Sequence, residues 1–184
     1  MEIALTHYLY YFSFFIMVAA LVTTWKYECS RYFLLFMLLL EGIDEALIPI
    51  TMTWTTHVYL YCIIFDLVFC IPIIYRKHIA QWIYNLTGWD FFRRVYNNHH
   101  LALQEIGFLF IFFIDIVLNT IIYAEVWLYK WWIIDNLYLK DYFRPVVLLF
   151  IYFFTCCALA TYTVKARARE EFYRTNKAPE SSTI

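Results

Sequence analysis

The chain has 184 residues, of which 64% are apolar and only 16% are charged. A soluble domain is about 45–50% apolar and about 25% charged, so this composition excludes a soluble globular protein and a disordered chain. Its 14 Lys and Arg nearly balance 15 Asp and Glu, and we expect no nucleic-acid partner. The sequence predicts an all-α, polytopic helical membrane protein in contact with the lipid bilayer.

A helix that crosses a bilayer needs about 20 mostly apolar residues. Five stretches meet this requirement and predict a transmembrane bundle within residues 1–164. They cover about 3–24, 32–50, 57–75, 105–129 and 143–164. Acidic residues interrupt the second stretch, so it either crosses the membrane or re-enters on the same side. Re-entry would reverse the orientation of every later span.

Residues 78–98 show a different pattern. Apolar and aromatic residues recur there every three or four positions, with basic residues at both ends. This pattern is typical of an amphipathic helix that lies in the membrane interface. A docking helix for a cytosolic protein is the alternative. Gly88 is expected to divide the segment into two short helices.

Basic residues gather in alternate connections and after the last span, which places the N-terminus outside and the C-terminus in the cytoplasm. Residues 165–184 are predicted to be a basic helical extension that ends in a disordered tail. The first apolar stretch lacks the features of a cleavable signal peptide, which favours a bacterial inner membrane. The side chains expected to contact lipid headgroups or a cytosolic partner are Arg76, Lys77, Arg93, Arg94, Lys165, Arg167 and Arg169.

Carboxylates in the middle of the predicted spans are the most informative feature. Glu41, Asp66 and Asp115 lie near the centres of the second, third and fourth spans, so we expect them at one depth. An acid at the centre of a span costs about 2.5–3.5 kcal/mol on insertion scales. The protein must therefore bury these acids, hydrate them or keep them protonated.

Further polar residues accompany these three acids. Asp44 and Glu45 follow Glu41 on the same helical face, and Asn119 follows Asp115 by one turn. No Lys or Arg occurs at 32–75 or 95–129, so we expect no counter-ion for the acids at their own depth.

The acid cluster has two main interpretations. Acids on facing helices without a counter-ion are typical of a proton or cation site. Neutral carboxyl groups can instead hold helices together through hydrogen bonds. Lys or Arg from another subunit could also meet them. The chain has only three glycines, which argues against a rocking transporter, because such proteins use broken and closely packed helices.

Histidine and cysteine give little sign of a metal or cofactor. His99 and His100 are weak metal candidates because adjacent residues point to different sides of a helix. We expect a solvated interfacial cap there, and a pH-sensing role is the alternative. The five cysteines form no C-x-x-C site and are expected to behave as small hydrophobic residues. The sequence thus predicts no metal and no cofactor.

Motifs of membrane enzymes are also missing. The chain has no P-loop, G-x-S-x-G or H-E-x-x-H, and it lacks the signatures of intramembrane aspartyl proteases and CDP-alcohol transferases. We therefore expect a non-catalytic sensor or scaffold subunit of an oligomeric membrane complex, formed with its own copies or with other membrane subunits. A proton- or cation-conducting subunit is the first alternative, and a small lipid-modifying enzyme is the second.

Overall fold

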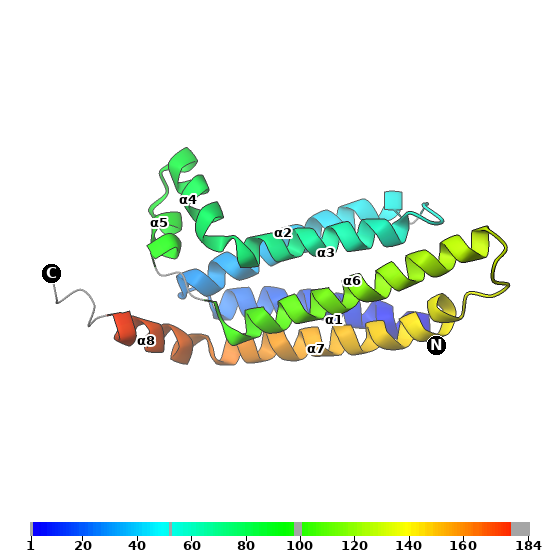
Figure 1. The fold of residues 1–184 in the computed structure, drawn as a ribbon. Coiled ribbons are helices and arrows are strands. Elements are labelled where there is room, and N and C mark those ends of the chain that lie inside the picture. Colours follow the sequence, from blue (N-terminus) through cyan, green and yellow to red (C-terminus); the bar gives the residue numbers. More distant parts are fainter. Residues whose placement is uncertain (1, 52, 98–100, 178–184) are drawn as a thin grey trace.

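The computed structural model describes residues 2–51, 53–97 and 101–177, and every regular element within them is helical (Figure 1). A helix occupies each of the five predicted stretches. These long helices are α1 (Glu2–Thr23), α2 (Glu28–Thr51), α3 (Val58–Ile74), α6 (Leu103–Lys130) and α7 (Arg144–Val164). The π-helical turn η1 (Leu139–Phe143) runs directly into α7.

Two of these helices are long and apolar enough to cross a membrane by themselves. They are α6 and the continuous segment Leu139–Val164. At about 1.5 Å per residue the 28 residues of α6 span about 42 Å, more than the hydrocarbon core of about 30 Å. Helix α3 provides a third candidate if it forms one bent span with α4 (Arg76–Thr87). The protein is thus helical with two or three candidate membrane spans, which is compatible with an integral membrane location.

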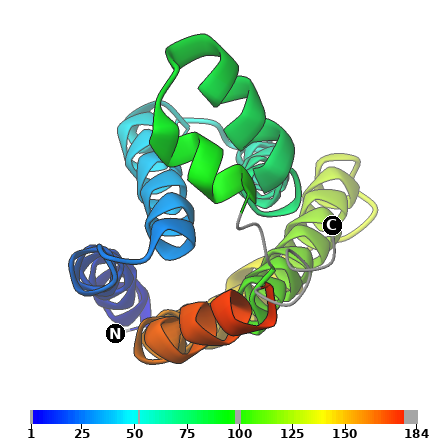
Figure 2. The ribbon, with the colours of Figure 1, turned by 90° about the vertical axis from the view of Figure 1, so that its left-hand side faces the viewer.

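The five long helices form a ring. Seen end-on, the order around it is α1, α2, α3, α6 and α7, and α7 packs against α1 to close it (Figure 2). The most extensive contacts join α3 to α6 and α1 to α7. Because α1 and α7 lie at opposite ends of the sequence, this closure brings the inner faces of all five helices around one interior.

Three shorter helices gather at one end of the ring. They are α4, α5 (Asp90–Asn97) and α8 (Ala166–Lys177). Helix α4 turns away from α3 by 77°. It ends at Gly88, whose φ of 69° belongs to the left-handed region that glycine adopts without strain. The predicted division at Gly88 is therefore confirmed. Residues 178–184, where the sequence predicts a disordered tail, lie outside the described residues.

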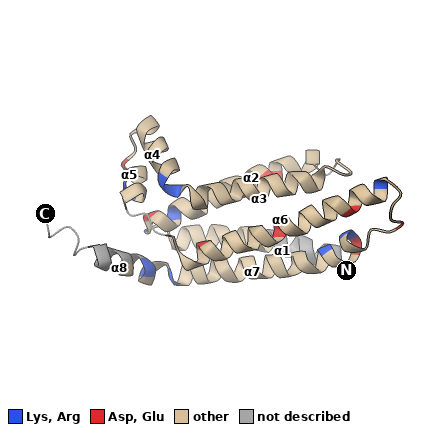
Figure 3. Ribbon diagram, viewed as in Figure 1, with Lys and Arg blue, Asp and Glu red and all other residues tan. Residues whose placement is uncertain are grey.

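The end that carries α4, α5 and α8 is called the basic end here. Figure 3 shows Lys and Arg concentrated there, at the start of α4 and at the junction of α7 with α8. The opposite end holds the connection between α2 and α3 and the connection between α6 and η1. Lys130, Lys140 and Arg144 lie toward that opposite end.

Tryptophan also marks the two ends of the ring. The chain has seven Trp, and the central turns of the five long helices contain none of them. Trp25, Trp82 and Trp89 lie at the basic end, whereas Trp54, Trp127, Trp131 and Trp132 lie toward the opposite end.

A layer of buried apolar and aromatic side chains fills the ring on the side of the basic end. All five long helices contribute to it, and the segment before α6 adds one alanine. This apolar layer consists of Met17, Ala20, Leu21, Phe33, Leu34, Met37, Phe69, Ile73, Ala102, Phe108, Leu159 and Tyr162. Its aromatic rings pack closely: the centroids of Phe33 and Tyr162 are 4.9 Å apart. The basic end is thereby separated from the rest of the interior.

Candidate functional site

Beyond the apolar layer the ring contains a cavity of about 200 Å³ with a mixed polar and apolar wall, which we call the chamber. Each of the five long helices contributes to its wall. Its charged and amide-bearing lining residues are Glu41 and Asp44 from α2, Asp66 from α3, Asp115 and Asn119 from α6, and Arg144 from α7. The acids that the sequence places at the centres of three predicted spans therefore share one cavity.

Helical spacing explains which residues reach the chamber. On α2 the lining residues Met37, Glu41 and Asp44 follow one another at intervals of four and three, so they form one stripe. Glu45 was expected on the same face, but it is exposed and does not line the chamber. On α6, Asp115 and Asn119 are four positions apart, and this spacing places both on the inner face.

Several polar atoms in the chamber are buried without a hydrogen-bond partner. They are one carboxyl oxygen each of Asp66 and Asp115 (Oδ2 and Oδ1) and the amide oxygen of Asn119. Asn119 is only 1% exposed, and its amide nitrogen donates to the backbone oxygen of Asp115 at 3.0 Å. An unpaired buried polar group costs about 1–3 kcal/mol, so a proton, water or ligand that reached these oxygens would be stabilised.

The four acids of the chamber are two on α2 and one each on α3 and α6. Asp66 and Asp115 interact directly with each other across the interface of α3 and α6. Two carboxyl groups in such contact repel one another when both are ionised, and a shared proton removes the repulsion. The two acids on α2 are Glu41 and Asp44, and Asp44 Oδ1 accepts a hydrogen bond from the Tyr61 hydroxyl of α3 at 2.7 Å.

The prediction that no basic residue accompanies the acids is wrong. Arg144 lines the chamber, and among the described lining residues it is the one with a cationic side chain. Its guanidinium carbon lies 5.4 Å from the centroid of the Tyr59 ring, and its Nε has no hydrogen-bond partner. The acids therefore have a positive charge nearby within the same chain.

Glu125 explains why Arg144 lies inside the bundle rather than at its edge. The Glu125 carboxylate accepts hydrogen bonds from the backbone N–H groups of Leu139 and Lys140, both at 2.8 Å. These bonds pair the first free amides of the π-helical turn, so the last helix starts at Leu139 instead of near residue 143. The extra turn carries Arg144 to the depth of the chamber.

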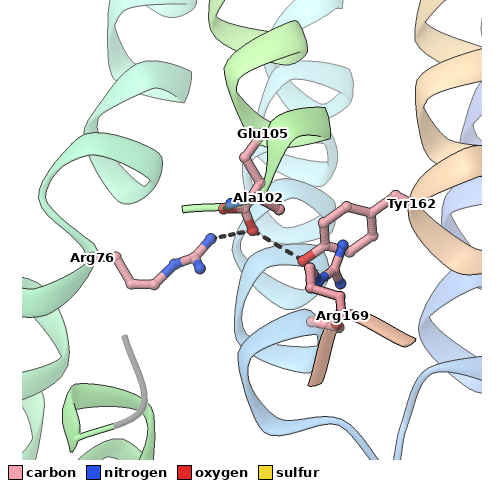
Figure 4. Close-up of polar contacts among 6 residues, drawn as sticks. Arg76, Ala102, Glu105, Tyr162 and Arg169 are labelled. Carbon is pink, nitrogen blue, oxygen red and sulfur yellow. Dashed lines mark hydrogen bonds and ion pairs between the residues drawn. The ribbon is translucent and has the colours of Figure 1, made fainter. Parts of the chain in front are cut away.

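A second buried polar cluster lies at the basic end (Figure 4). Arg76 Nη2 donates to Glu105 Oε1 at 2.5 Å, and both side chains are 1% exposed. The Tyr162 hydroxyl donates to the same oxygen at 3.0 Å, and Glu105 Oε2 accepts the Ala102 N–H at 2.9 Å. One carboxylate thus ties the start of α4 to α6 and α7.

The residues expected to contact lipid or a partner have different environments. Arg76 is turned inward to Glu105, so it is not available to headgroups. Arg169 is half-buried: it donates to Ser30 Oγ at 2.6 Å and lies 4.0 Å above the Tyr162 ring. Those with exposed side chains are Lys77, Arg93, Arg94, Lys165 and Arg167.

Metal-ligating side chains do not converge in the described part of the chain, where no group of three or more His, Cys, Asp or Glu could hold an ion. His99 and His100 lie outside the described residues. The functional groups that line the chamber are carboxyl groups, one amide, one guanidinium, several hydroxyl groups and the thiol of Cys62.

Comparison with known proteins adds no relative: no family model, curated protein or solved structure matches this chain.

Proposed function

We propose that this protein is a five-helix integral membrane subunit that senses protons or cations through its chamber. The observation that carries the proposal is the gathering of carboxyl groups from three helices in one cavity of a largely apolar ring. Such a cavity gains stability when a proton or cation enters, because its acids otherwise repel one another in a medium that solvates charge poorly.

Two features support a membrane crossing by all five long helices. The charges that make α2 look too polar to cross include Glu41 and Asp44, which face the chamber instead of lipid. The Trp residues lie toward the two ends of the ring, as in the aromatic belts at the two surfaces of a bilayer. We propose a bacterial inner membrane, with the basic end in the cytoplasm.

The apolar layer favours sensing over conduction. It lies between the chamber and the basic end, and it contains large buried side chains such as Phe33, Phe108 and Tyr162. A proton or cation in the chamber would have to pass through this layer to cross the protein. Conduction remains the second candidate function because acids from several helices line one cavity, as they do along a proton path.

The outer surface and the basic end suit contacts with other molecules. Phe110, Phe113 and Phe150 are exposed on α6 and α7, where they can pack against lipid or a neighbouring subunit. The exposed Lys and Arg of the basic end suit anionic headgroups or an acidic cytosolic protein. We propose that the protein works within an oligomer or a larger membrane complex.

Infrared titration of the purified protein in lipid nanodiscs tests the sensing function. We expect a carbonyl band of protonated carboxyl groups that changes with pH and is largely lost in Asp66→Asn and Asp115→Asn. The matched control is Asp135→Asn, which alters an exposed loop carboxyl and should leave the band unchanged. A band that is the same in all three variants would exclude the chamber as the proton site.

Flux through the same protein in liposomes separates the two candidate functions. A sensor should carry no sustained proton or sodium current under an imposed gradient. Sustained flux that disappears in Asp115→Asn, while the variant still assembles, would establish conduction and exclude the sensor.

Glycosylation provides a test of the orientation. Asn85-Leu86-Thr87 is an acceptor sequence in an exposed part of α4, and it should stay unmodified in microsomes if the basic end is cytoplasmic. Tyr138→Thr creates the same Asn-Leu-Thr sequence at Asn136, in the exposed connection at the opposite end, and this site should be modified. A glycan on Asn85 and none on Asn136 would reverse the orientation.

A further inference from the structure

We propose that the chamber binds a small aliphatic diamine, that is, two ammonium groups joined by a short hydrocarbon chain. This inference rests on the proposed function and names the class of cation that the chamber recognises. The features that support it are the placement of two acids on α2 and two on α3 and α6, the apolar parts of the wall and the volume.

A bare metal ion fits the chamber poorly. Ions such as Ca²⁺ need six to eight oxygen ligands around one point. The chamber acids share one cavity, but no three of the metal-ligating side chains in the described residues converge on a single position. Met17, Met37, Phe69 and Phe108 supply apolar atoms to the same wall. A larger cation with an apolar body would match this mixed lining better than an ion.

Charge also favours two positive groups. Four carboxylates and one guanidinium line the chamber, so four minus one leaves three negative charges when all are ionised. The Asp66–Asp115 pair lies on α3 and α6, whereas Glu41 and Asp44 lie on α2. One ammonium group at each pair would neutralise two of the three charges.

Hydrogen bonding points in the same direction. An ammonium group brings three donors and no acceptor. The oxygens in the chamber that lack a partner are acceptors on Asp66, Asp115 and Asn119. The Asn119 oxygen belongs to an amide that is 1% exposed and lines the chamber, so a donor that reached it would pair with it.

The volume is sufficient for a short ligand. A cavity of about 200 Å³ has room for several groups of the size of a water molecule. A diamine with four or five carbons has six or seven non-hydrogen atoms. Its methylene groups would lie against Met37 and Phe69 while its ends meet the acid pairs.

Calorimetry with the full-length protein in nanodiscs tests this inference, with 1,4-diaminobutane as the probe. We expect saturable binding that weakens at least tenfold in Asp115→Asn and in Glu41→Gln, one variant for each acid pair. Asp135→Asn should bind as the wild type does. The neutral isostere 1,4-butanediol, NaCl and CaCl₂ should give no saturable signal. Gel filtration and circular dichroism of each variant establish that it is folded.

The outcomes separate the two proposals. Absence of saturable diamine binding by the wild-type protein, equal binding of the diol, or unchanged binding in both chamber variants would overturn the diamine site. If the pH-dependent carboxyl band is still present in that case, the proton-sensing function stands and only the ligand is excluded. If the band is absent as well, both proposals fail.

Discussion

Arg76→Ala is expected to lower the free energy of unfolding by about 3–5 kcal/mol, the range observed when one partner of a buried ion pair is removed. Both Arg76 and Glu105 are 1% exposed, so the substitution leaves a buried carboxylate without its cation. The remaining donors, the Tyr162 hydroxyl and the Ala102 N–H, are neutral and cannot replace the lost charge. Unfolding in a detergent titration, followed by circular dichroism, measures the change.

The exposed pair of Arg94 and Glu28 provides the matched control. Its nitrogen–oxygen distance is also 2.5 Å, but the two side chains are 52% and 29% exposed. Arg94→Ala should therefore cost no more than about 1 kcal/mol. Equal effects of Arg76→Ala and Arg94→Ala would show that burial does not set the strength of the inner pair. Glu105→Gln keeps an acceptor for Ala102 and should be less damaging than Glu105→Ala.

Local features of the structure could be read from the sequence. Apolar stretches of about 20 residues locate the five long helices because a helix of that length satisfies its own backbone groups. Gly88 could be recognised as a helix end because only glycine readily adopts a positive φ there. The inward position of Glu41, Asp66 and Asp115 could be expected from the cost of leaving an acid on the outside of an apolar helix.

Pairings across the ring could not be read in this way. Arg76 follows an apolar stretch and resembles a loop residue that contacts headgroups, yet it meets Glu105, which is 29 residues away in the sequence. The sequence around Arg76 does not indicate that Glu105 is its partner, and the sequence around Glu105 does not indicate Arg76. Arg144 is a similar case, because Pro145 after it suggests that the helix starts there and leaves the arginine at the membrane surface.

The two buried polar sites have different compositions and are separated by the apolar layer. At the basic end the Glu105 carboxylate is paired with the Arg76 cation and with the Tyr162 hydroxyl, so the cluster is suited to fixing α4, α6 and α7 in place. In the chamber several acceptors have no partner and the acids outnumber the cation. A carboxylate that already has a cationic partner has little to gain from a ligand, whereas an acceptor without a partner does. This contrast is why we assign function to the chamber and stability to the basic end.

Glu125→Ala is expected to lower the free energy of unfolding by about 2–4 kcal/mol, because hydrogen bonds to a charged group contribute about 1.5–3 kcal/mol each. Glu125 is 7% exposed, and its two oxygens hold the Leu139 and Lys140 amides. Without it the turn of residues 139–143 loses its cap. Hydrogen exchange measured by mass spectrometry should then be faster in that turn and unchanged in the middle of α3.

The same substitution links the cap to the chamber. If the turn unwinds, Arg144 no longer lies at the same depth as the acids. The chamber then loses its positive charge. The infrared titration of the chamber acids should then differ from that of the wild type, because the acids have lost their nearby cation. Asp135→Ala, which removes an exposed acid from the preceding connection, should change neither the exchange rates nor the titration. Unchanged exchange at residues 139–143 in Glu125→Ala would mean that packing, and not the carboxylate, holds Arg144 in the bundle.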